Sequence, residues 1–350
     1  MSAVEPRIVN AYAATKPGLE VEPFQYQARP LGLEDVEIAI SHCGICGSDL
    51  HTISGGWGGA NYPVVPGHEI VGTITSIGSD VKHLKVGDRV GVGAMVFSCL
   101  EKDTCKACAT DLEPYCTKCV YTYNSKYADG QPSYGGYAEY VRVSGHYAFK
   151  IPEVIPSDVA APLLCAGVTV YTPLKAHVKP GQRVGVVGIG GLGHLGLQFI
   201  RALGAEPVAF SQSPNKEQAA RELGAVDFIN LSNPDDLARA QRSVDVLLVT
   251  ADAKGQAYDT YLSTIAIGGK LIMVGVPDDK MAFSAFSIVS GGISVIGSMI
   301  GGIKETTDML VLAAAKGVRP VIQKLPMKEA NTGIKMVDDG SVRYRVVLEN

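Results

Sequence analysis

The sequence predicts an α/β protein with two domains, a β-rich, barrel-like unit and a doubly wound parallel sheet. Three observations support this prediction. The 350 residues are too many for one ordinary core. Short β-branched runs separated by glycines fill the first third of the chain. After residues 179–181, apolar strands alternate with amphipathic helices, which is the pattern of βαβ units around a parallel sheet.

The expected elements follow this division. In the first domain we expect strands at 36–40, 70–77 and 88–92. In the second we expect strands at 183–187, 206–210, 244–250 and 270–274, and helices at 192–203 and 216–223. A tail beyond residue 300 holds a helix at 305–316 and a strand at 344–348. We therefore place the domains at 1–160 and 161–300, followed by a C-terminal segment at 301–350.

Composition and charge exclude several classes of protein. Hydrophobic residues make up 46% of the chain and charged residues 19%, so a disordered chain is not expected. The formal net charge of −4 gives no reason to expect a nucleic acid or an anionic membrane as partner. We recognise no signal-peptide pattern and no apolar run long enough to span a bilayer. We therefore expect a cytoplasmic protein with reduced thiols.

The cysteines suggest two zinc sites of different kinds. One set is close together, within eighteen residues: Cys99, Cys105, Cys108 and Cys116. Four close thiolates can fill a tetrahedral zinc shell, whereas three scattered ligands leave a position open for chemistry. The scattered set is Cys46, His68 and Cys165. A redox role for the C-x-x-C pair remains an alternative, and the remaining cysteines, Cys43 and Cys119, are interpreted as spectator thiols.

A glycine turn indicates a dinucleotide site. Gly188, Gly190 and Gly193, with Gly191 and Leu192 between them, follow an expected strand and open an expected helix. In this context glycines let backbone amides approach a pyrophosphate, and the helix N-terminus supplies partial positive charge. The alternative is a turn that packs helix on strand and binds nothing.

The end of the second strand favours NADP(H). An Asp or Glu there would accept from the ribose 2′-OH and repel a 2′-phosphate. This chain has instead Ser211, Gln212, Ser213 and Lys216, and no carboxylate before Glu217. Hydroxyls and an ammonium can hold a phosphate dianion. A solvated polar turn beside an NAD site remains the alternative.

These motifs together resemble the zinc-dependent medium-chain alcohol dehydrogenases, in particular the NADP-specific branch similar to cinnamyl alcohol dehydrogenase. The resemblance is carried by GICGSDLH, PGHEIVG, the four-cysteine lobe at about 99–116, YGGYAEYVRV, APLLCAGVTVY, GIGGLGHLG and RYRVVLEN. It implies a GroES-like catalytic domain that the C-terminal segment rejoins, a Rossmann cofactor domain, two zinc ions per chain and a homodimer.

The resemblance also implies residue roles. Cys46, His68 and Cys165 match the ligands of the catalytic zinc, and Glu69 matches a carboxylate that can approach the metal. The remaining matches are Asp49 as the residue that orients His68, Ser48 and His51 as a proton relay, and Ser298 and Arg345 as cofactor contacts. Each has a simpler interpretation: Cys165 as a core residue, His51 as a surface histidine and Ser48 as a cap of the segment that follows it.

The chain departs from the family pattern twice. Gly47 stands where many relatives carry a basic residue that faces the pyrophosphate. Five residues, rather than two, separate Cys99 from Cys105, so Cys99 must reach the metal across a longer loop. If it does not, the lobe binds zinc with three thiolates.

The implied activity is reversible hydride transfer between a primary alcohol, aromatic or medium aliphatic, and NADP⁺. Candidate pocket residues are Trp57, Met95 and Phe286, each of which could equally belong to the core. One alternative is reduction of an iminium or α,β-unsaturated carbonyl on the same fold, which would need no alcohol proton relay. Another is a non-catalytic dinucleotide-binding redox sensor, which predicts a broken ligand set.

Overall fold

The computed structural model describes residues 7–277 and 280–350, and they form two compact units. The first unit comprises Met1–Cys165, Gly301–Ala314 and Pro320–Asn350, and the second Ala166–Ile300 and Ala315–Arg319. The boundary thus lies at 165/166, where the sequence suggested 160/161. Residues 1–6, part of the segment inspected for a signal peptide, lie outside the described residues.

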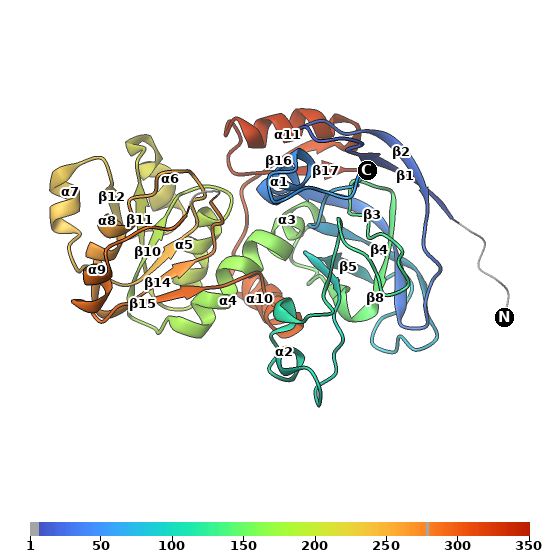
Figure 1. Ribbon diagram of the computed structural model, residues 1–350, viewed down its shortest axis with the longest axis horizontal. Helices are drawn as coiled ribbons and strands as arrows, with labels where there is room; N and C mark the ends of the chain where they lie inside the picture. The colour runs from blue at the N-terminus through green and yellow to red at the C-terminus, as the bar shows by residue number, and fades with distance from the viewer. Residues whose placement is uncertain (1–6, 278–279) are drawn as a thin grey trace. The chain divides into compact units, whose positions relative to one another are not determined.

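The first unit is built around a seven-stranded sheet (Figure 1). Its strands are β3 (Asp35–Ile45), β4 (Ile70–Ile77), β5 (Arg89–Val92), β8 (Tyr140–Ser144), β9 (Phe149–Lys150), β16 (Ile322–Pro326) and β17 (Arg345–Glu349). The order is β16-β17-β3-β4-β5-β9, and β8 also pairs with β3. Strands β16 and β17 are parallel, and the other pairs are antiparallel. The C-terminal strand therefore extends a sheet that begins with residue 35.

Smaller elements surround this sheet. Two further strand pairs are β1 (Ile8–Ala13) with β2 (Glu22–Gln27), and β6 (Met95–Phe97) with β7 (Val120–Tyr121). The helices are α1 (Gly47–Ser54), α2 (Lys106–Ala109), α3 (Ser157–Pro162), α10 (Ile303–Lys316) and α11 (Ala330–Asp338), with short 3-10 turns η1 (Glu113–Tyr115), η2 (Gly145–Tyr147) and η5 (Met327–Glu329). Helix α11 packs against β16 and β17.

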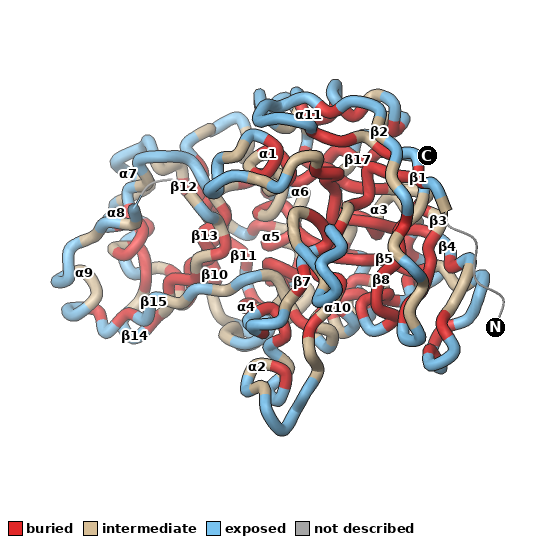
Figure 2. Tube along the Cα trace, turned by 45° about the vertical axis from the view of Figure 1, so that its right-hand side comes forward, coloured by how far each residue is buried: buried red, intermediate tan, exposed pale blue. Residues whose placement is uncertain are grey.

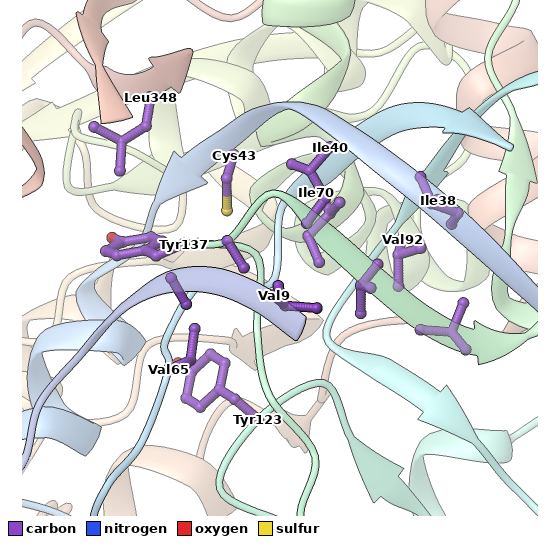
Figure 3. Packing of buried hydrophobic residues seen from close by; sticks show 14 of the residues in the cluster. Val9, Ile38, Ile40, Cys43, Val65, Ile70, Val92, Tyr123, Tyr137 and Leu348 are labelled. Atoms are coloured by element: carbon purple, nitrogen blue, oxygen red, sulfur yellow. The ribbon is translucent and has the colours of Figure 1, made fainter. Parts of the chain in front are cut away.

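A continuous apolar core lies under the strands of the first unit. Figure 3 shows Cys43, Ile70, Tyr137 and Leu348 gathered between β3, β4, β17 and the segment before β8. All four are buried, and Tyr137 is 0% exposed. Their burial stabilises the framework from which the polar site residues described below project.

The second unit is a doubly wound parallel sheet. Its strands are β10 (Arg183–Val187), β11 (Glu206–Ser211), β12 (Asp227–Asn230), β13 (Val244–Val249), β14 (Ile265–Met273) and β15 (Ser294–Gly297). Its helices are α4 (Val168–His177), α5 (Gly193–Ala202), α6 (Glu217–Glu222), α7 (Pro234–Arg239), α8 (Tyr258–Ser263) and α9 (Ala285–Val289), with the 3-10 turn η4 (Pro214–Lys216). The order β12-β11-β10-β13-β14-β15, with all pairs parallel, is that of a Rossmann sheet.

The predicted fold class is confirmed, because a β-rich unit and a parallel βαβ unit are both present. The tube in Figure 2 is buried along β10, β11 and β13 but largely exposed over α7 and α9, as expected for central strands covered by surface helices.

Several elements differ from the sequence-based expectation. The apolar run at 286–300, which lies outside the expected elements given above, begins within helix α9 and continues into strand β15. The helix starts there because the Ser284 side chain accepts a hydrogen bond from the Phe286 N–H and caps it. Strand β14 begins earlier than expected, at Ile265, and the C-terminal segment contains α11 and β16 besides the helix and strand that we expected. Helix α1 was not anticipated, because it is short and begins with a glycine.

One helical run, Ser157–His177, is long and apolar enough to cross a membrane by length and composition, although the sequence analysis recognised no such run. It comprises α3, a π-helical turn η3 (Leu163–Gly167) and α4. Of its most apolar window, 78% is buried inside the protein. Its start packs on β3 and β4 and its end on α5, so it has the surroundings of a core helix.

Candidate active site and metal centres

Four side chains from three separate segments of the first unit meet in one buried cluster. Cys46 immediately precedes helix α1, His68 and Glu69 immediately precede β4, and Cys165 lies in the π-helical turn η3. One ligand atom from each lies within 4.8 Å of the others, and all four residues are buried. The sulfurs of Cys46 and Cys165 are 3.9 Å apart, and His68 Nε2 is 3.0 Å from Cys165 Sγ.

This donor set suits a zinc ion. Zinc–sulfur bonds of about 2.3 Å in a tetrahedron place two sulfurs about 3.8 Å apart, close to the Cys46–Cys165 separation. Glu69 Oε2 is buried without a hydrogen-bond partner among the described residues. An orphaned carboxylate oxygen beside two thiols and an imidazole is costly unless a cation or a donor group satisfies it.

The Asp49 carboxylate holds this cluster together from within helix α1. It is 0% exposed, and it accepts hydrogen bonds from the backbone N–H groups of Cys46 (2.9 Å) and Gly67 (3.1 Å). Its Oδ1 also lies 3.3 Å from His68 Nδ1. Because Nδ1 faces this carboxylate, Nε2 is left free to face the two sulfurs. Asp49 therefore contacts His68 directly, and its role in orienting a metal ligand remains a prediction.

Two tyrosines that the sequence analysis missed complete these surroundings. The Tyr137 hydroxyl donates to Asp49 Oδ2 at 3.4 Å, and the Tyr123 hydroxyl lies 3.3 Å from His68 Nδ1. Burial first, and then the Asp49 charge, raise the pKa of both tyrosines well above the usual range. Both therefore remain neutral donors. The only sequence signal was a tyrosine in each of the segments YTYN and YGGY, which does not specify a partner.

The cluster is electrostatically prepared for a cation. The hydrogen bond from Cys165, followed by His68, holds the pKa of Cys46 well below its usual value, whereas the hydrogen bond with Cys46 and burial raise the pKa of Cys165. Burial lowers the pKa of His68, but the Asp49 charge and hydrogen bond outweigh burial and raise it well above the usual value. Because zinc binds thiolates and a neutral imidazole, a cation bound here would displace the protons of Cys165 and His68.

Arg345 lies beside the cluster instead of on the protein surface. Its side chain is buried, and its guanidinium pairs with Glu69 Oε1. Burial raises the pKa of Glu69 to about 7, although the charge of Arg345 opposes this shift. Gly44 leaves room for the pair, since a Cβ there would collide with the Glu69 carboxylate. The cofactor contact expected of Arg345 remains a prediction, and its Nε is buried without a partner among the described residues.

The expected relay residues lie on one face of helix α1. Ser48 Oγ is 3.6 Å from Cys46 Sγ, at the edge of the cluster. His51 follows one turn later, and the two side chains make no direct hydrogen bond. The His51 ring stacks on Trp57, which is 47% exposed. Met95, the second candidate pocket residue, is buried, whereas Phe286 is 77% exposed on α9 of the second unit.

The four close cysteines form the second cluster. Cys99 Sγ lies 3.6 Å from the sulfurs of both Cys108 and Cys116, and Cys105 Sγ lies 3.8 Å from that of Cys116. These separations match the roughly 3.8 Å edge of a zinc–thiolate tetrahedron. The longer loop at 100–104 therefore brings Cys99 to the other three. Leu100 adopts a positive φ of 53° and turns the chain back.

The thiols of this lobe differ in acidity. A hydrogen bond from the backbone of Cys108 lowers the pKa of Cys105 to about 7, while burial raises the pKa of Cys108 to about 12. Since zinc binds thiolates, metal binding would release the proton of Cys108. Cys119, also with a pKa raised to about 12 by burial, is not part of the cluster.

The glycine turn of the second unit links β10 to α5. Gly188 has a φ of 90°, and a Cβ at Gly193 would collide with the Gly188 carbonyl oxygen, so these two glycines are needed for the fold of the turn. A Cβ at Gly190 meets nothing within 4 Å. The open space above Gly190 is the cradle that a pyrophosphate would need at a helix N-terminus.

Hydrogen bonds hold the segment after β11 to itself and to the glycine turn. Ser211 is buried, and its hydroxyl accepts a hydrogen bond from the Ser213 N–H at 3.1 Å. The Lys216 ammonium donates to the Ile189 carbonyl at 3.0 Å, which connects this segment to the glycine turn. Gln212 is exposed, and Ser298, at the end of β15, is half-buried. The structure thus brings Lys216 to the glycine turn.

Family models match both units. Residues 32–153 match the model described as alcohol dehydrogenase GroES-like domain, and residues 191–315 match that described as zinc-binding dehydrogenase. The matches cover the segments that hold His68, the four-cysteine lobe and much of the parallel sheet.

Similar proteins span almost the full chain. A probable mannitol dehydrogenase of Mesembryanthemum crystallinum is 42% identical over 99% of this chain and 96% of its own length. The vomilenine reductase of Rauvolfia serpentina is 41% identical over 97% and 94%. Among solved structures, a cinnamyl alcohol dehydrogenase from Sorghum bicolor has a TM-score of 0.94 and 37% identity, covering 98% of both chains. The Helicobacter pylori CAD complexed with NADP(H) has a TM-score of 0.91 and 33% identity, also covering 98% of both.

The position of Asp49 predicts a selective effect on metal binding. Asp49→Asn keeps the size of the side chain but replaces one carboxylate oxygen by an NH₂ group. That group cannot accept hydrogen bonds from the Cys46 and Gly67 N–H groups or from His68 Nδ1. We expect zinc affinity at the Cys46–His68–Cys165 cluster to fall about 10- to 100-fold. Competition with a chromogenic chelator measures this, with the four-cysteine lobe as internal control and Asp80→Asn, on an exposed turn, as matched variant. Equal affinity in all three proteins would contradict the assigned role.

The glycine turn predicts different outcomes for a glycine-to-alanine substitution at two of its positions. Gly190→Ala should leave the melting temperature within about 2 °C, because the added methyl meets open space, but should weaken cofactor binding at least tenfold, about 1.4 kcal/mol. Gly193→Ala should lower the melting temperature by several degrees, because the methyl collides with backbone. Isothermal titration with NADPH and thermal scans check both, and tight binding by Gly190→Ala would remove the pyrophosphate from this turn.

Proposed function

Because this chain belongs to the zinc-binding medium-chain alcohol dehydrogenases, the family that includes the cinnamyl alcohol dehydrogenases, we propose that it catalyses reversible hydride transfer between a primary alcohol and NADP⁺. A large aromatic or medium aliphatic aldehyde is the proposed product of oxidation. If NADPH is the cellular form, the working direction is aldehyde reduction. We further propose two zinc ions per chain, one in each cluster.

The cluster of Cys46, His68, Glu69 and Cys165 is the observation that carries this proposal. Two sulfurs and one imidazole nitrogen face a common point, with the nitrogen selected by Asp49. A non-catalytic redox sensor would have no need to retain this set intact.

The residues of the cluster perform complementary tasks. When bound, zinc supplies a Lewis acid that favours loss of the alcohol proton and polarises a carbonyl. Cys46, His68 and Cys165 hold it, and Asp49 keeps the imidazole in the binding tautomer. The Ser48 hydroxyl, at the edge of the cluster, would donate its own proton onward as it accepts one from the alcohol side, and His51 would release a proton to water. Because Ser48 and His51 share no hydrogen bond, the nicotinamide ribose hydroxyl would have to bridge them when the cofactor is bound.

Most of the proposed cofactor contacts belong to the second unit, and Arg345 belongs to the first. When bound, NADP(H) carries the hydride. The open cradle above Gly190 would take its pyrophosphate, and Lys216, with Ser211, Gln212 and Ser213, would receive the 2′-phosphate. Ser298 and Arg345 are proposed as further contacts. The NADP(H) in the Helicobacter pylori relative supports the preference for this cofactor.

A second candidate reaction is reduction of an iminium or α,β-unsaturated carbonyl. The 41% identity to a protein called vomilenine reductase favours it. Such a reduction would need no relay for an alcohol proton, whereas Ser48 and His51 are both retained on one face of α1. We therefore place it second.

The proposed assembly is a homodimer, located in the cytoplasm. Strand β15 is an edge strand with Val295 39% exposed, and Phe286 and Val289 of α9 are 77% and 78% exposed. An unpaired edge beside apolar side chains suits pairing with its copy across a two-fold axis. Light scattering of the purified protein tests the dimer, and cell fractionation tests the location.

An aldehyde and alcohol panel tests the activity. Wild-type protein should reduce aromatic and aliphatic aldehydes with NADPH, and a chelator should abolish turnover. His68→Ala should lose at least about 10³-fold in kcat while binding NADPH with unchanged affinity, because only the metal site is altered. The exposed His146→Ala is the matched control. Activity on unsaturated carbonyls alone would favour the second candidate, and equal activity of His68→Ala would refute the metal assignment.

The segment after β11 predicts a change in cofactor preference. In Ser211→Asp the new carboxylate would face the 2′-phosphate, and like-charge repulsion of about 3 kcal/mol should raise KM for NADP⁺ about 100-fold. KM for NAD⁺ should change much less, since that cofactor carries a 2′-hydroxyl there. Steady-state kinetics with both cofactors measure the two values. Equal changes would mean that the phosphate binds elsewhere.

A further inference from the structure

The only tryptophan of the chain is stacked on the histidine of the proposed relay. The indole of Trp57 and the imidazole of His51 have centroids 4.8 Å apart and planes inclined by only 8°. His51 occupies the last turn of helix α1, and Trp57 lies in the turn that follows. The contact is therefore local to one short segment of the first unit.

The backbone between the two residues is arranged for this contact. Gly55 ends α1 in the left-handed conformation, with φ 78°, and its N–H bonds to the carbonyls of His51 and Thr52. The Gly56 N–H also bonds to the His51 carbonyl at 2.8 Å. A Cβ on Gly56 would lie 3.5 Å from His51 Nδ1, so the chain passes close to the imidazole before Trp57 covers its face.

No polar side chain holds the imidazole. It makes no hydrogen bond or ion pair with any residue from 7–277 or 280–350. Asp49, two residues earlier on α1, is directed toward Gly67 and His68 instead. Helix α11 packs against α1 and carries Lys335 and Asp338, but neither pairs with His51.

We propose that Trp57 is a positioning residue for His51, whose ring orientation is set by the indole face and not by a hydrogen bond. This inference rests on the proposed function, in which His51 accepts a proton at one ring nitrogen and releases it to water. A stacked face leaves both ring nitrogens available for that exchange.

Steady-state kinetics of alcohol oxidation test the positioning role with two variants. Trp57→Leu removes the aromatic face, and we expect kcat to fall about tenfold with a shifted pH profile and little change in KM. Trp57→Phe retains a ring face and should recover most of the wild-type profile. Far-UV circular dichroism and zinc content confirm that both variants are folded. Equal profiles for the two variants, or a change in KM alone, would overturn the proposal.

Fluorescence tests the contact without any catalysis. Because Trp57 is the sole tryptophan and the imidazole lies against its face, His51→Gln should change the indole emission measured at a fixed pH. The matched variant His83→Gln, at a histidine that stacks on His146, should leave the emission unchanged. Equal emission from wild type and His51→Gln would overturn the stack while leaving the dehydrogenase assignment intact. A changed emission in His51→Gln, with no alcohol dehydrogenase activity in the wild type, would instead refute the proposed function.

Discussion

The buried carboxylate of Asp49 is the interaction on which the first unit's site depends. It accepts the backbone N–H groups of Cys46 and Gly67 and faces His68 Nδ1. One side chain thereby joins the start of helix α1 to the loop before β4. A buried charge is tolerated there because its oxygens are matched by donors from both segments. Without Asp49, no single side chain would hold the proposed metal ligands Cys46 and His68 in position relative to each other.

The glycines of the chain serve distinct purposes at the two sites. Gly44 makes room for the Glu69–Arg345 pair, and Gly193 allows helix α5 to start against the Gly188 carbonyl. Gly190 has no such neighbour, so the fold of the turn does not require a glycine there, and its contact with a pyrophosphate remains a proposal. Only the surrounding atoms distinguish the glycines of this motif that the fold needs from the one that it does not.

The two cysteine clusters differ in how their members are assembled. The four cysteines of the lobe lie within eighteen residues, and their short connections keep the sulfurs close together. The other cluster draws on helix α1, the loop before β4 and the turn η3, which the sheet and α3 must bring together. The first site therefore depends mainly on local loop geometry, including the positive φ of Leu100, whereas the second depends on the packing of the whole unit.

The sequence alone determined what local spacing and periodicity can specify: the β-rich and βαβ halves, strands 70–77 and 183–187, the glycine turn, and the close four-cysteine set. Family resemblance was needed to connect Cys46, His68 and Cys165. Only the tertiary structure placed Arg345 against Glu69, Tyr123 and Tyr137 around Asp49, and Trp57 over His51. The physical reason is the distance along the sequence between the partners. A hydrogen bond between residues far apart in the chain leaves no periodic pattern in the sequence. A stacked pair between a helix and the turn after it likewise depends on one left-handed glycine, whose conformation the sequence does not reveal.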